Sequence, residues 1–328
     1  MSFLACRVFQ EGGAIAARLE PLDVDALTPG NVVIRAEWSG VNFKDALAVT
    51  GRGKILKRFP LNAGIDVAGR VESASDPRFK PGDAVLVNGM GLGETNDGGF
   101  AGVVRVPGDW IVPLPPGLSG FDAMTLGTAG FTAGLGLHRM EVNGQTPDLG
   151  PIVVTGATGG VGSAAVSMLA ARGYRVVAVS GRPEHEGYLQ ALGAHEVTTP
   201  EGLQLGARPL EGARFGGVID NVGGSLLAGL LRHVHPWGNV AAIGMAGGAD
   251  FDATVFPFIL RGVSLLGASS TNCPMGLRAE IWNRLGGDLK PPHLAQIAGE
   301  VVPLREVIRA CEKVMDRKAR GRILVDCR

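Results

Sequence analysis

The sequence has few cysteines, no net charge and no long apolar run. Its four cysteines, Cys6, Cys273, Cys311 and Cys327, form no Cys-x-x-Cys pair, so neither a zinc knuckle nor a disulfide framework is indicated. The 31 basic and 31 acidic residues balance, which argues against a protein that binds nucleic acid or a membrane surface. No apolar stretch reaches the roughly 18 residues that a membrane span needs.

The first residues do not form a signal peptide, because Arg7 and Glu11 interrupt the apolar run too early. We therefore expect a cytoplasmic protein whose partner is a small molecule. Glycine, in contrast, is abundant, with 51 residues among 328. These glycines have no period and lie within apolar segments, so they indicate turns and close backbone approaches rather than a collagen or a linker.

The middle of the chain alternates short β-branched runs with helix-length segments. Helical spacing is clearest in 162–173 and 186–194, which end at Gly173 and Gly193. Strands separated by crossovers of this length predict a parallel, doubly wound sheet. The expected strands are 152–156, 175–180, 195–199, 216–222, 239–245 and 263–268.

The first 124 residues have a different pattern, with short strands divided by Gly and Pro turns, which predicts an antiparallel, partly closed β domain. The tail reads as strand, helix and strand, and we expect it to rejoin this β domain. The predicted fold is thus α/β, with a Rossmann domain at 125–264 inserted into a β-rich substrate domain at 1–124 and 265–328.

The stretch VTGATGGVGS follows an expected strand and opens an expected helix. Gly156 permits a tight exit from the strand, and Gly159 and Gly160 allow the backbone to approach a pyrophosphate. Gly162 allows close packing of the helix, whose N-terminus favours phosphate. In this context the loop predicts a dinucleotide site.

The end of the second strand indicates which dinucleotide binds. An NAD site usually has an acidic residue there for the ribose hydroxyls. Here Ser180, Gly181 and Arg182 occupy the position, and no carboxylate appears before Glu184. Because a hydroxyl and a guanidinium can bind a 2′-phosphate, the sequence predicts NADPH.

This organisation resembles the medium-chain dehydrogenase/reductase superfamily, in which zinc members carry a Gly-His-Glu motif. The corresponding residues here are Gly64-Ile65-Asp66, and the usual cysteine position is held by Asn42 or Phe43. We therefore expect no metal. Hydride addition to a carbon–carbon double bond activated by a carbonyl is favoured over alcohol oxidation.

A narrower resemblance rests on several segments in order, from VNFKDALAVTGRGKILKRFPLNAGIDVAG through VVTGATGGVGS, VVAVSGR and FPFILRGVSLLGASS to GRILV. Together they are similar to the acrylyl-CoA reductase (NADPH) family of zinc-free, quinone-oxidoreductase-like enzymes. The resemblance implies a GroES-like fold for the β domain. It also implies NADPH-dependent reduction of acryloyl-CoA to propanoyl-CoA.

The resemblance also assigns site residues. Phe43 would lie near the nicotinamide, where relatives often have a tyrosine, and would stack on the ring without offering a phenolic proton. The remaining cofactor contacts that it implies are Thr158, Gly159, Gly160 and Val161 at the pyrophosphate, Ser180, Gly181 and Arg182 at the 2′-phosphate, and Met245, Ile259, Ser270 and Lys318 along the cofactor. Met245 and Ile259 are alternatively ordinary core residues.

The candidates for catalysis are Asn42, Phe43 and Asp45, with Lys44 as a further polar candidate. Asn42 would donate a hydrogen bond to the ribose or the carbonyl, and Asp45 would orient a neighbour. Arg52, Lys54, Lys57 and Arg58 form a basic cluster that either attracts CoA phosphates or is a solvated loop.

Three further expectations concern the whole protein. A quinone or other enone reductase would share every cofactor feature and differ only in its pocket. A catalytically idle NADPH-binding protein is an alternative of another class. We expect a homodimer.

Overall fold

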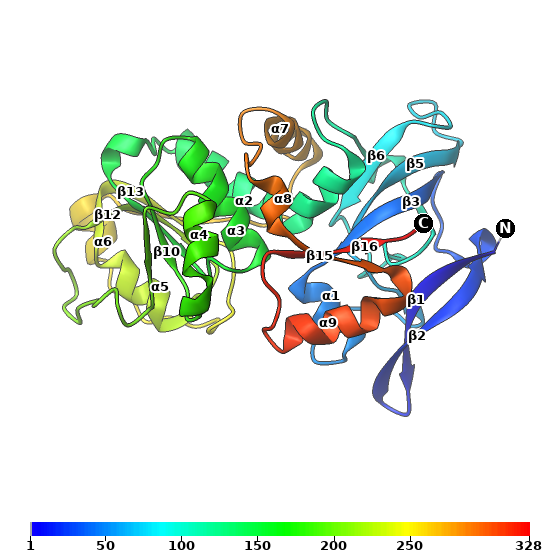
Figure 1. The fold of residues 1–328 in the computed structure, drawn as a ribbon, viewed down its shortest axis with the longest axis horizontal. Coiled ribbons are helices and arrows are strands. Elements are labelled where there is room, and N and C mark those ends of the chain that lie inside the picture. The colour runs from blue at the N-terminus through cyan, green and yellow to red at the C-terminus, as the bar shows by residue number, and fades with distance from the viewer. Residues whose placement is uncertain (1) are drawn as a thin grey trace. The chain divides into compact units, whose positions relative to one another are not determined.

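The computed structural model describes residues 2–328, which divide into two compact units (Figure 1). Unit 1 contains the described residues up to Thr128, together with Ser270–Gly287 and Ile297–Arg328. Unit 2 contains Ala129–Ser269 and Asp288–Gln296. The β-rich part of the chain is therefore discontinuous in sequence, as the tail pattern predicts.

Unit 2 is built on a six-stranded parallel sheet in the order β11-β10-β9-β12-β13-β14. Its central strands are fully buried, and their sequences IVVT and VVAV are the continuous apolar runs typical of parallel sheets. The order reverses between β9 and β12, which makes this the switch point where such sheets bind ligands. The strands are β9 (Ile152–Thr155), β10 (Val176–Val179), β11 (Glu196–Thr198), β12 (Phe215–Asp220), β13 (Val234–Ala242) and β14 (Ser264–Gly267).

The helices of unit 2 follow these strands. The two expected from spacing are present, and each ends two residues before a glycine with positive φ, Gly173 at 79° and Gly193 at 105°. They are α3 (Gly160–Ala171) and α4 (Glu186–Ala191), and the others within the unit are α5 (Gly224–Leu231) and α6 (Phe256–Arg261).

Unit 1 contains two sheets. The smaller has the order β2-β1-β4, and the larger has the order β15-β16-β3-β5-β6-β8, with β7 also pairing β3. All pairs are antiparallel except β15 with β16, and β16 pairs β3, so the tail rejoins the β domain as expected. The strands are β1 (Ser2–Glu11), β2 (Ala14–Asp23), β3 (Val32–Val41), β4 (Leu61–Asn62), β5 (Asp66–Ala74), β6 (Ala84–Asn88), β7 (Val103–Val106), β8 (Val112–Pro113), β15 (Ala298–Pro303) and β16 (Arg322–Asp326).

Two helices of unit 1, α1 (Phe43–Val49) and α9 (Val307–Met315), lie side by side (Figure 1). Their buried residues join the strands in one hydrophobic core. Of the other helices, α7 (Met275–Gly286) belongs to unit 1, whereas α2 (Gly120–Val142) and α8 (Leu294–Ile297) are divided between the two units. Gly127 breaks α2 with φ 50° and ψ −155°.

The division into units differs in detail from the expected boundaries. Strand β14 crosses the expected boundary at 264, and it pairs with β13 and so extends the sheet of unit 2. Residues 288–296 also cluster with unit 2, whereas 125–128 cluster with unit 1. Strand pairing and tertiary contacts set these boundaries, and neither leaves a periodic pattern in the sequence.

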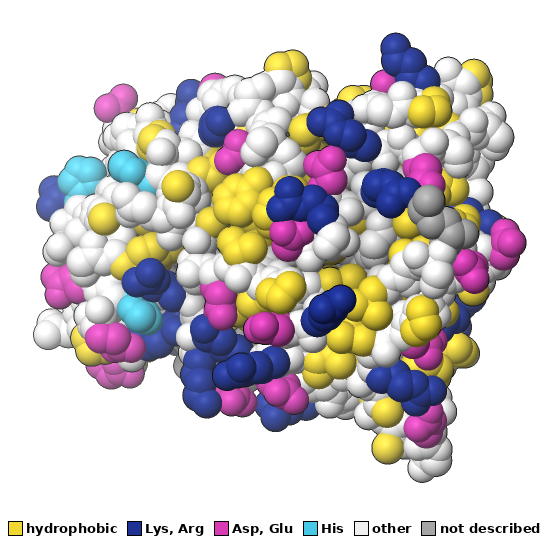
Figure 2. All heavy atoms as spheres, turned by 45° about the vertical axis from the view of Figure 1, so that its right-hand side comes forward, with side chains coloured by type: hydrophobic (Ala, Val, Ile, Leu, Met, Phe, Trp, Pro, Cys, Tyr) yellow, Lys and Arg dark blue, Asp and Glu magenta, His cyan; other side chains and the backbone are white. Residues whose placement is uncertain are grey.

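The surface mixes both signs of charge. Figure 2 shows basic and acidic side chains interspersed over one face, in keeping with the balanced composition. Within residues 2–328, no helix combines the length and the apolar character needed to cross a membrane.

Candidate active site

The glycine loop of unit 2 leaves β9 at the switch point and leads into α3. Gly156 has φ 58°, in the left-handed region that favours glycine. A Cβ at Gly162 would lie 2.4 Å from the Gly156 carbonyl oxygen and 2.6 Å from the Ala157 Cα atom. The chain therefore turns too tightly here for a side chain, and the first N–H groups of α3 are left without a carbonyl one turn earlier. This is a cradle suited to a pyrophosphate.

Arg182 folds back over this loop. Its Nη2 atom donates a hydrogen bond to Thr158 Oγ1, and its backbone N–H donates to Ser180 Oγ at 3.1 Å. Ser180 directly follows β10, and the first carboxylate after it, Glu184, is exposed. The structure thus brings two sets of expected cofactor residues together through Arg182 and Thr158, with no acidic residue between them.

Two neighbouring strand ends carry polar residues that the sequence analysis did not single out. Thr155 Oγ1 donates to Asp220 Oδ1 at 2.7 Å, and Asp220 Oδ2 accepts the Gly223 N–H at 2.7 Å. Asn221 Nδ2 donates to the Thr155 carbonyl at 2.7 Å. Burial raises the pKa of Asp220 above its usual value. These hydrogen bonds hold the ends of β9 and β12 together. In the sequence, a polar residue directly after each of two buried apolar runs is the pattern that indicates this cluster.

The other residues assigned to the cofactor are more scattered. Met245 and Ile259 are 69% and 68% exposed, so neither is a core residue. Ser270 lies in unit 1, where its carbonyl accepts a hydrogen bond from Arg278 Nη2 at 2.7 Å. Lys318, also in unit 1, lies 3.1 Å from Asp316 Oδ2.

In unit 1, Asn42 and Asp45 form the start of α1. Asp45 Oδ2 accepts the Asn42 backbone N–H at 2.8 Å and its Nδ2 group at 3.0 Å, while Asp45 Oδ1 accepts the Ile65 N–H at 2.8 Å. Asp45 is 1% exposed. Both carboxyl oxygens are thus engaged within the protein, so Asp45 positions the backbone around Asn42.

The same cluster continues to a buried ion pair. Asn42 Nδ2 donates to Asp66 Oδ2 at 2.7 Å, and Arg322 Nη1 donates to Asn42 Oδ1 at 2.8 Å. Arg322 Nη2 lies 3.5 Å from Asp66 Oδ2. Thr128 completes the set, because its N–H and hydroxyl donate to Asp66 at 2.9 and 2.5 Å. The Asn42 amide is therefore fully committed to holding this network.

The electrostatics of this network depend on its burial. Burial, followed by repulsion from Asp66, raises the pKa of Asp45 to about 7. Burial lowers the pKa of Arg322, while the two carboxylates favour its charged form. One guanidinium therefore compensates two buried carboxyl groups, Asp45 and Asp66.

Next to this network, α1 presents Phe43 and Lys44. The Phe43 side chain is 54% exposed, which leaves its ring available for stacking. Lys44 Nζ lies 2.9 Å from Glu94 Oε1 and 3.1 Å from Thr271 Oγ1. Lys44 is therefore tied to its own unit by an ion pair.

The zinc-motif position, Gly64-Ile65-Asp66, holds no histidine. Among residues 2–328, no three or more His, Cys, Asp or Glu side chains gather as a metal-binding group. Asp66, at the position of the zinc motif, receives hydrogen bonds from Asn42 and Thr128. Absence of metal stays a prediction for the enzyme in solution.

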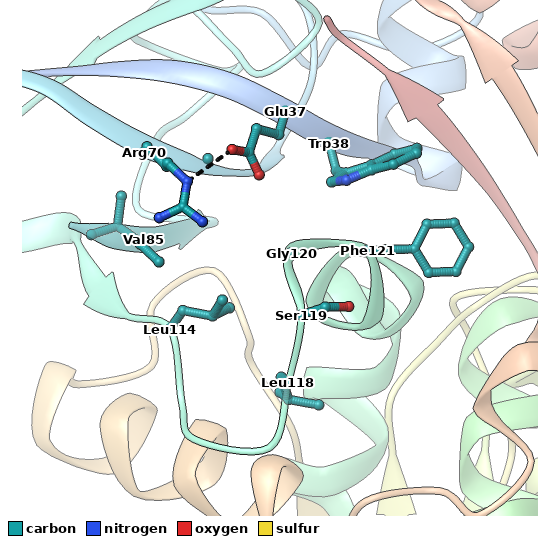
Figure 3. Close-up of a pocket in the computed structure, with 11 residues that line it drawn as sticks. Glu37, Trp38, Arg70, Val85, Leu114, Leu118, Ser119, Gly120 and Phe121 are labelled. Atoms are coloured by element: carbon teal, nitrogen blue, oxygen red, sulfur yellow. Dashed lines mark ion pairs between the residues drawn. The ribbon is translucent and has the colours of Figure 1, made fainter. Parts of the chain in front are cut away.

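A hollow of about 360 Å³ lies in unit 1 beside the first turn of α2 (Figure 3). Trp38 and Phe121 line it, together with Glu37 and Arg70, which form an ion pair at 3.2 Å. None of the expected site residues lines this hollow. Its opposite charges compensate each other, so it does not select an anion.

Comparison with known proteins agrees with this geometry. Residues 160–283 match the family model for zinc-binding dehydrogenases, and residues 28–116 match that for the alcohol dehydrogenase GroES-like domain. A relative from Escherichia coli (strain K12), named as a probable acrylyl-CoA reductase AcuI, is 46% identical over 96% of this chain and 97% of its own.

Two further relatives have similar folds. The Bacillus subtilis protein YhfP, which is named for quinone oxidoreduction, is 45% identical over 98% of both chains. Its structure with NAD bound has a TM-score of 0.97 over 99% of both chains, at 44% identity. The structure of E. coli K-12 YhdH with bound NADPH has a TM-score of 0.95 at 45% identity, over 99% of this chain and 100% of the other.

These matches extend over the full chain and include both the glycine loop and the β domain. The chain therefore belongs to the acrylyl-CoA reductase family, in the quinone-oxidoreductase-like branch of the medium-chain dehydrogenase/reductase superfamily.

Proposed function

We propose that this chain is an oxidoreductase that uses NADPH to reduce acryloyl-CoA to propanoyl-CoA. The choice of NADPH rests on the Arg182 side chain, which donates a hydrogen bond to Thr158 in a glycine loop that has no carboxylates. The observation that carries the substrate is the full-length relationship to an acrylyl-CoA reductase. A quinone reductase is the second candidate, because the equally similar YhfP is named for quinones.

Different groups of residues contact different parts of NADPH in this proposal. Thr158, Gly159, Gly160 and Val161 hold the pyrophosphate, and Ser180, Gly181 and Arg182 hold the 2′-phosphate. Phe43 stacks on the nicotinamide ring, and its exposure supports this role. Met245, Ile259, Ser270 and Lys318 are proposed as further cofactor contacts on the basis of the family resemblance.

When bound, NADPH supplies a hydride for the β-carbon of the substrate. Asn42 and Asp45 act as positioning residues, since their polar groups are used to fix the start of α1 and thereby Phe43. The α-carbon takes its proton from water, because Asp45 is buried with both oxygens engaged. This chain therefore contributes by aligning the substrate with the nicotinamide and by placing water, and it needs no acidic side chain.

The direct test of the reaction uses NADPH deuterated at the transferred position. We expect propanoyl-CoA that carries one deuterium at the β-carbon, with the α-carbon proton drawn from solvent. Mass spectrometry of the product measures both atoms. Formation of no propanoyl-CoA, or deuterium at the α-carbon instead, would contradict the proposal.

Arg182→Ala tests the cofactor. The unmodified enzyme should prefer NADPH over NADH by at least about tenfold in kcat/KM, about 1.4 kcal/mol. The variant should lose most of this preference while its kcat/KM with NADH stays nearly unchanged, because only NADPH has the 2′-phosphate that Arg182 would bind. Arg175→Ala, which removes an exposed arginine elsewhere in unit 2, is the control. Equal kcat/KM for the two cofactors in the unmodified enzyme would refute the assignment.

We further propose a homodimer that forms through β14. Among the described strands, β14 has only β13 beside it, so its other edge offers backbone groups for pairing. Around it, Val142, Trp237 and Leu265 are 76%, 74% and 36% exposed. Asn143 Nδ2 donates to Ser264 Oγ at 2.9 Å, which ties the end of α2 to this edge.

Leu265→Lys should dissociate this dimer, because it places a charge on the paired edge. Sedimentation velocity should give twice the chain mass of 33.9 kDa for the unmodified protein and the mass of one chain for the variant. Val301→Lys, on the edge strand β15 and 48% exposed, is the matched control. A monomeric unmodified protein would exclude the dimer, and dissociation by Val301→Lys alone would move the interface to β15.

The four cysteines also bear on location. All four are buried and free, which suits a reducing compartment. We propose the cytoplasm.

A further inference from the structure

Two segments of unit 1 that are far apart in sequence meet beside the paired helices α1 and α9. The first, residues 50–60, follows α1, and the second, residues 316–321, follows α9. Arg52 Nη1 lies 3.9 Å from Asp316 Oδ1, and Asp316 Oδ2 lies 3.1 Å from Lys318 Nζ. The Asp316 carboxylate therefore joins the two segments into one surface, which we call the basic surface.

The backbone of the basic surface is anchored from below. Leu56 is buried in the core of unit 1, and Met315 and Ala319 pack against the same core. The Lys57 N–H donates to the Glu94 carbonyl at 2.8 Å, and the Lys318 N–H donates to the Lys313 carbonyl at 3.1 Å. Both segments thus present their side chains from a fixed frame rather than from a loose loop.

The charge of the basic surface is strongly positive. Asp316 is its one acidic residue, although the whole chain has no net charge. The nearby Glu94 and Glu300 are used elsewhere, since Lys44 and Lys313 lie 2.9 and 2.6 Å from them. The basic residues, all exposed, are Arg52, Lys54, Lys57, Arg58, Arg317, Lys318 and Arg320.

A cluster of this kind recognises several phosphates at once, because each cation adds to one field. The α1 helix, about 10 Å long for its seven residues, separates the basic surface from Asn42 at the other end of the helix. An extended pantetheine arm spans more than one such helix. The distance therefore suits a substrate whose reacting end lies near Phe43 and whose phosphates lie at the basic surface.

We propose that the basic surface binds the pyrophosphate and 3′-phosphate of the CoA handle of the substrate. This inference rests on the proposed function for its substrate. Lys318 keeps the cofactor role proposed above, so the test of the CoA handle changes Lys54 and Arg58. The phosphates of CoA and of NADPH share the same chemistry, and the experiment separates them.

The experiment compares Lys54→Glu/Arg58→Glu with Lys80→Glu. Lys80 is another exposed lysine of unit 1, in the segment between β5 and β6. For Lys54→Glu/Arg58→Glu, kcat/KM for acryloyl-CoA should fall at least about tenfold. With acryloyl-pantetheine, which has the same reacting group but no 3′-phospho-ADP, the fall should be under about twofold. The KM for NADPH and the Lys80→Glu variant should be unaffected.

Other results would overturn the inference. Equal losses with acryloyl-CoA and acryloyl-pantetheine would show that the charges do not touch the handle. A rise in the KM for NADPH in Lys54→Glu/Arg58→Glu, with kcat/KM for acryloyl-CoA otherwise unaffected, would place these cations at the cofactor instead. Lower thermal stability of the variants with unchanged kinetics would show that the cations only balance the C-terminal ends of α1 and α9.

Calorimetric titration with coenzyme A, in protein saturated with NADP⁺, separates this inference from the proposed function. If the unmodified protein binds coenzyme A and Lys54→Glu/Arg58→Glu weakens binding at least about tenfold, the basic surface stands even if acryloyl-CoA is not reduced. If acryloyl-CoA is reduced but coenzyme A binds the variant as tightly as the unmodified protein, the function stands and the basic surface is refuted.

Discussion

Gly162→Ala should weaken NADPH binding by at least about 100-fold, about 2.8 kcal/mol. The added Cβ would lie 2.4 Å from the Gly156 oxygen and 2.6 Å from the Ala157 Cα atom, and both are backbone atoms that cannot rotate away. The chain leaving β9 must therefore move, and the N–H groups at the start of α3 move with it. Fluorescence titration with NADPH measures the loss of affinity.

The matched control for this variant is Gly187→Ala in α4. A Cβ at Gly187 meets no atom within 4 Å, so this change adds a methyl group to a helix of the same unit without a clash. It should leave NADPH affinity unchanged and stabilise the helix slightly. If Gly162→Ala binds NADPH as well as Gly187→Ala does, the loop does not cradle the cofactor.

Arg322→Leu should lower the free energy of unfolding by about 3–5 kcal/mol, because it leaves buried carboxyl groups without their countercharge. Arg322 is 3% exposed, and its Nη2 atom lies 3.5 Å from Asp66, while Nη1 donates to Asn42. Arg322 forms the buried ion pair with Asp66, whose carboxylate is fully buried. Urea unfolding of the ligand-free protein measures the change.

Arg35→Leu is the control for Arg322→Leu. Arg35 lies in β3 of the same sheet and pairs with Glu72 at 3.0 Å, but its side chain is 52% exposed. An exposed pair of this kind contributes about 0–1 kcal/mol. Should Arg322→Leu cost no more than Arg35→Leu, the buried network would not stabilise unit 1 as described.

Sequence patterns predict the local parts of this protein well. The strands of unit 2 and the glycine loop are continuous in sequence, and their apolar runs and glycine spacing identified them. The sequence pattern also predicts that the tail rejoins the β domain, and its last strand, β16, pairs with β3 there. Helix α2 was not predicted, since its many glycines, among them Gly127, hide the helical pattern.

The buried network is the part of the site that sequence alone could not assemble. Asn42 and Arg322 are 280 positions apart, and Asn42 and Asp66 are 24 apart. Only the pairing of β16, β3 and β5 brings them together. The sequence identifies Asp66 only as the residue at a zinc-motif position, and its ion pair with Arg322 follows from the fold.

The central claim is that this enzyme reduces acryloyl-CoA with NADPH, and the ratio of kcat/KM for acryloyl-CoA to that for a simple quinone tests it most directly. The binding of the CoA handle should align the small alkene with the hydride, so we expect acryloyl-CoA to be favoured by at least about tenfold. A kcat/KM for the quinone equal to or above that for acryloyl-CoA, or no NADPH oxidation with either, would contradict the claim.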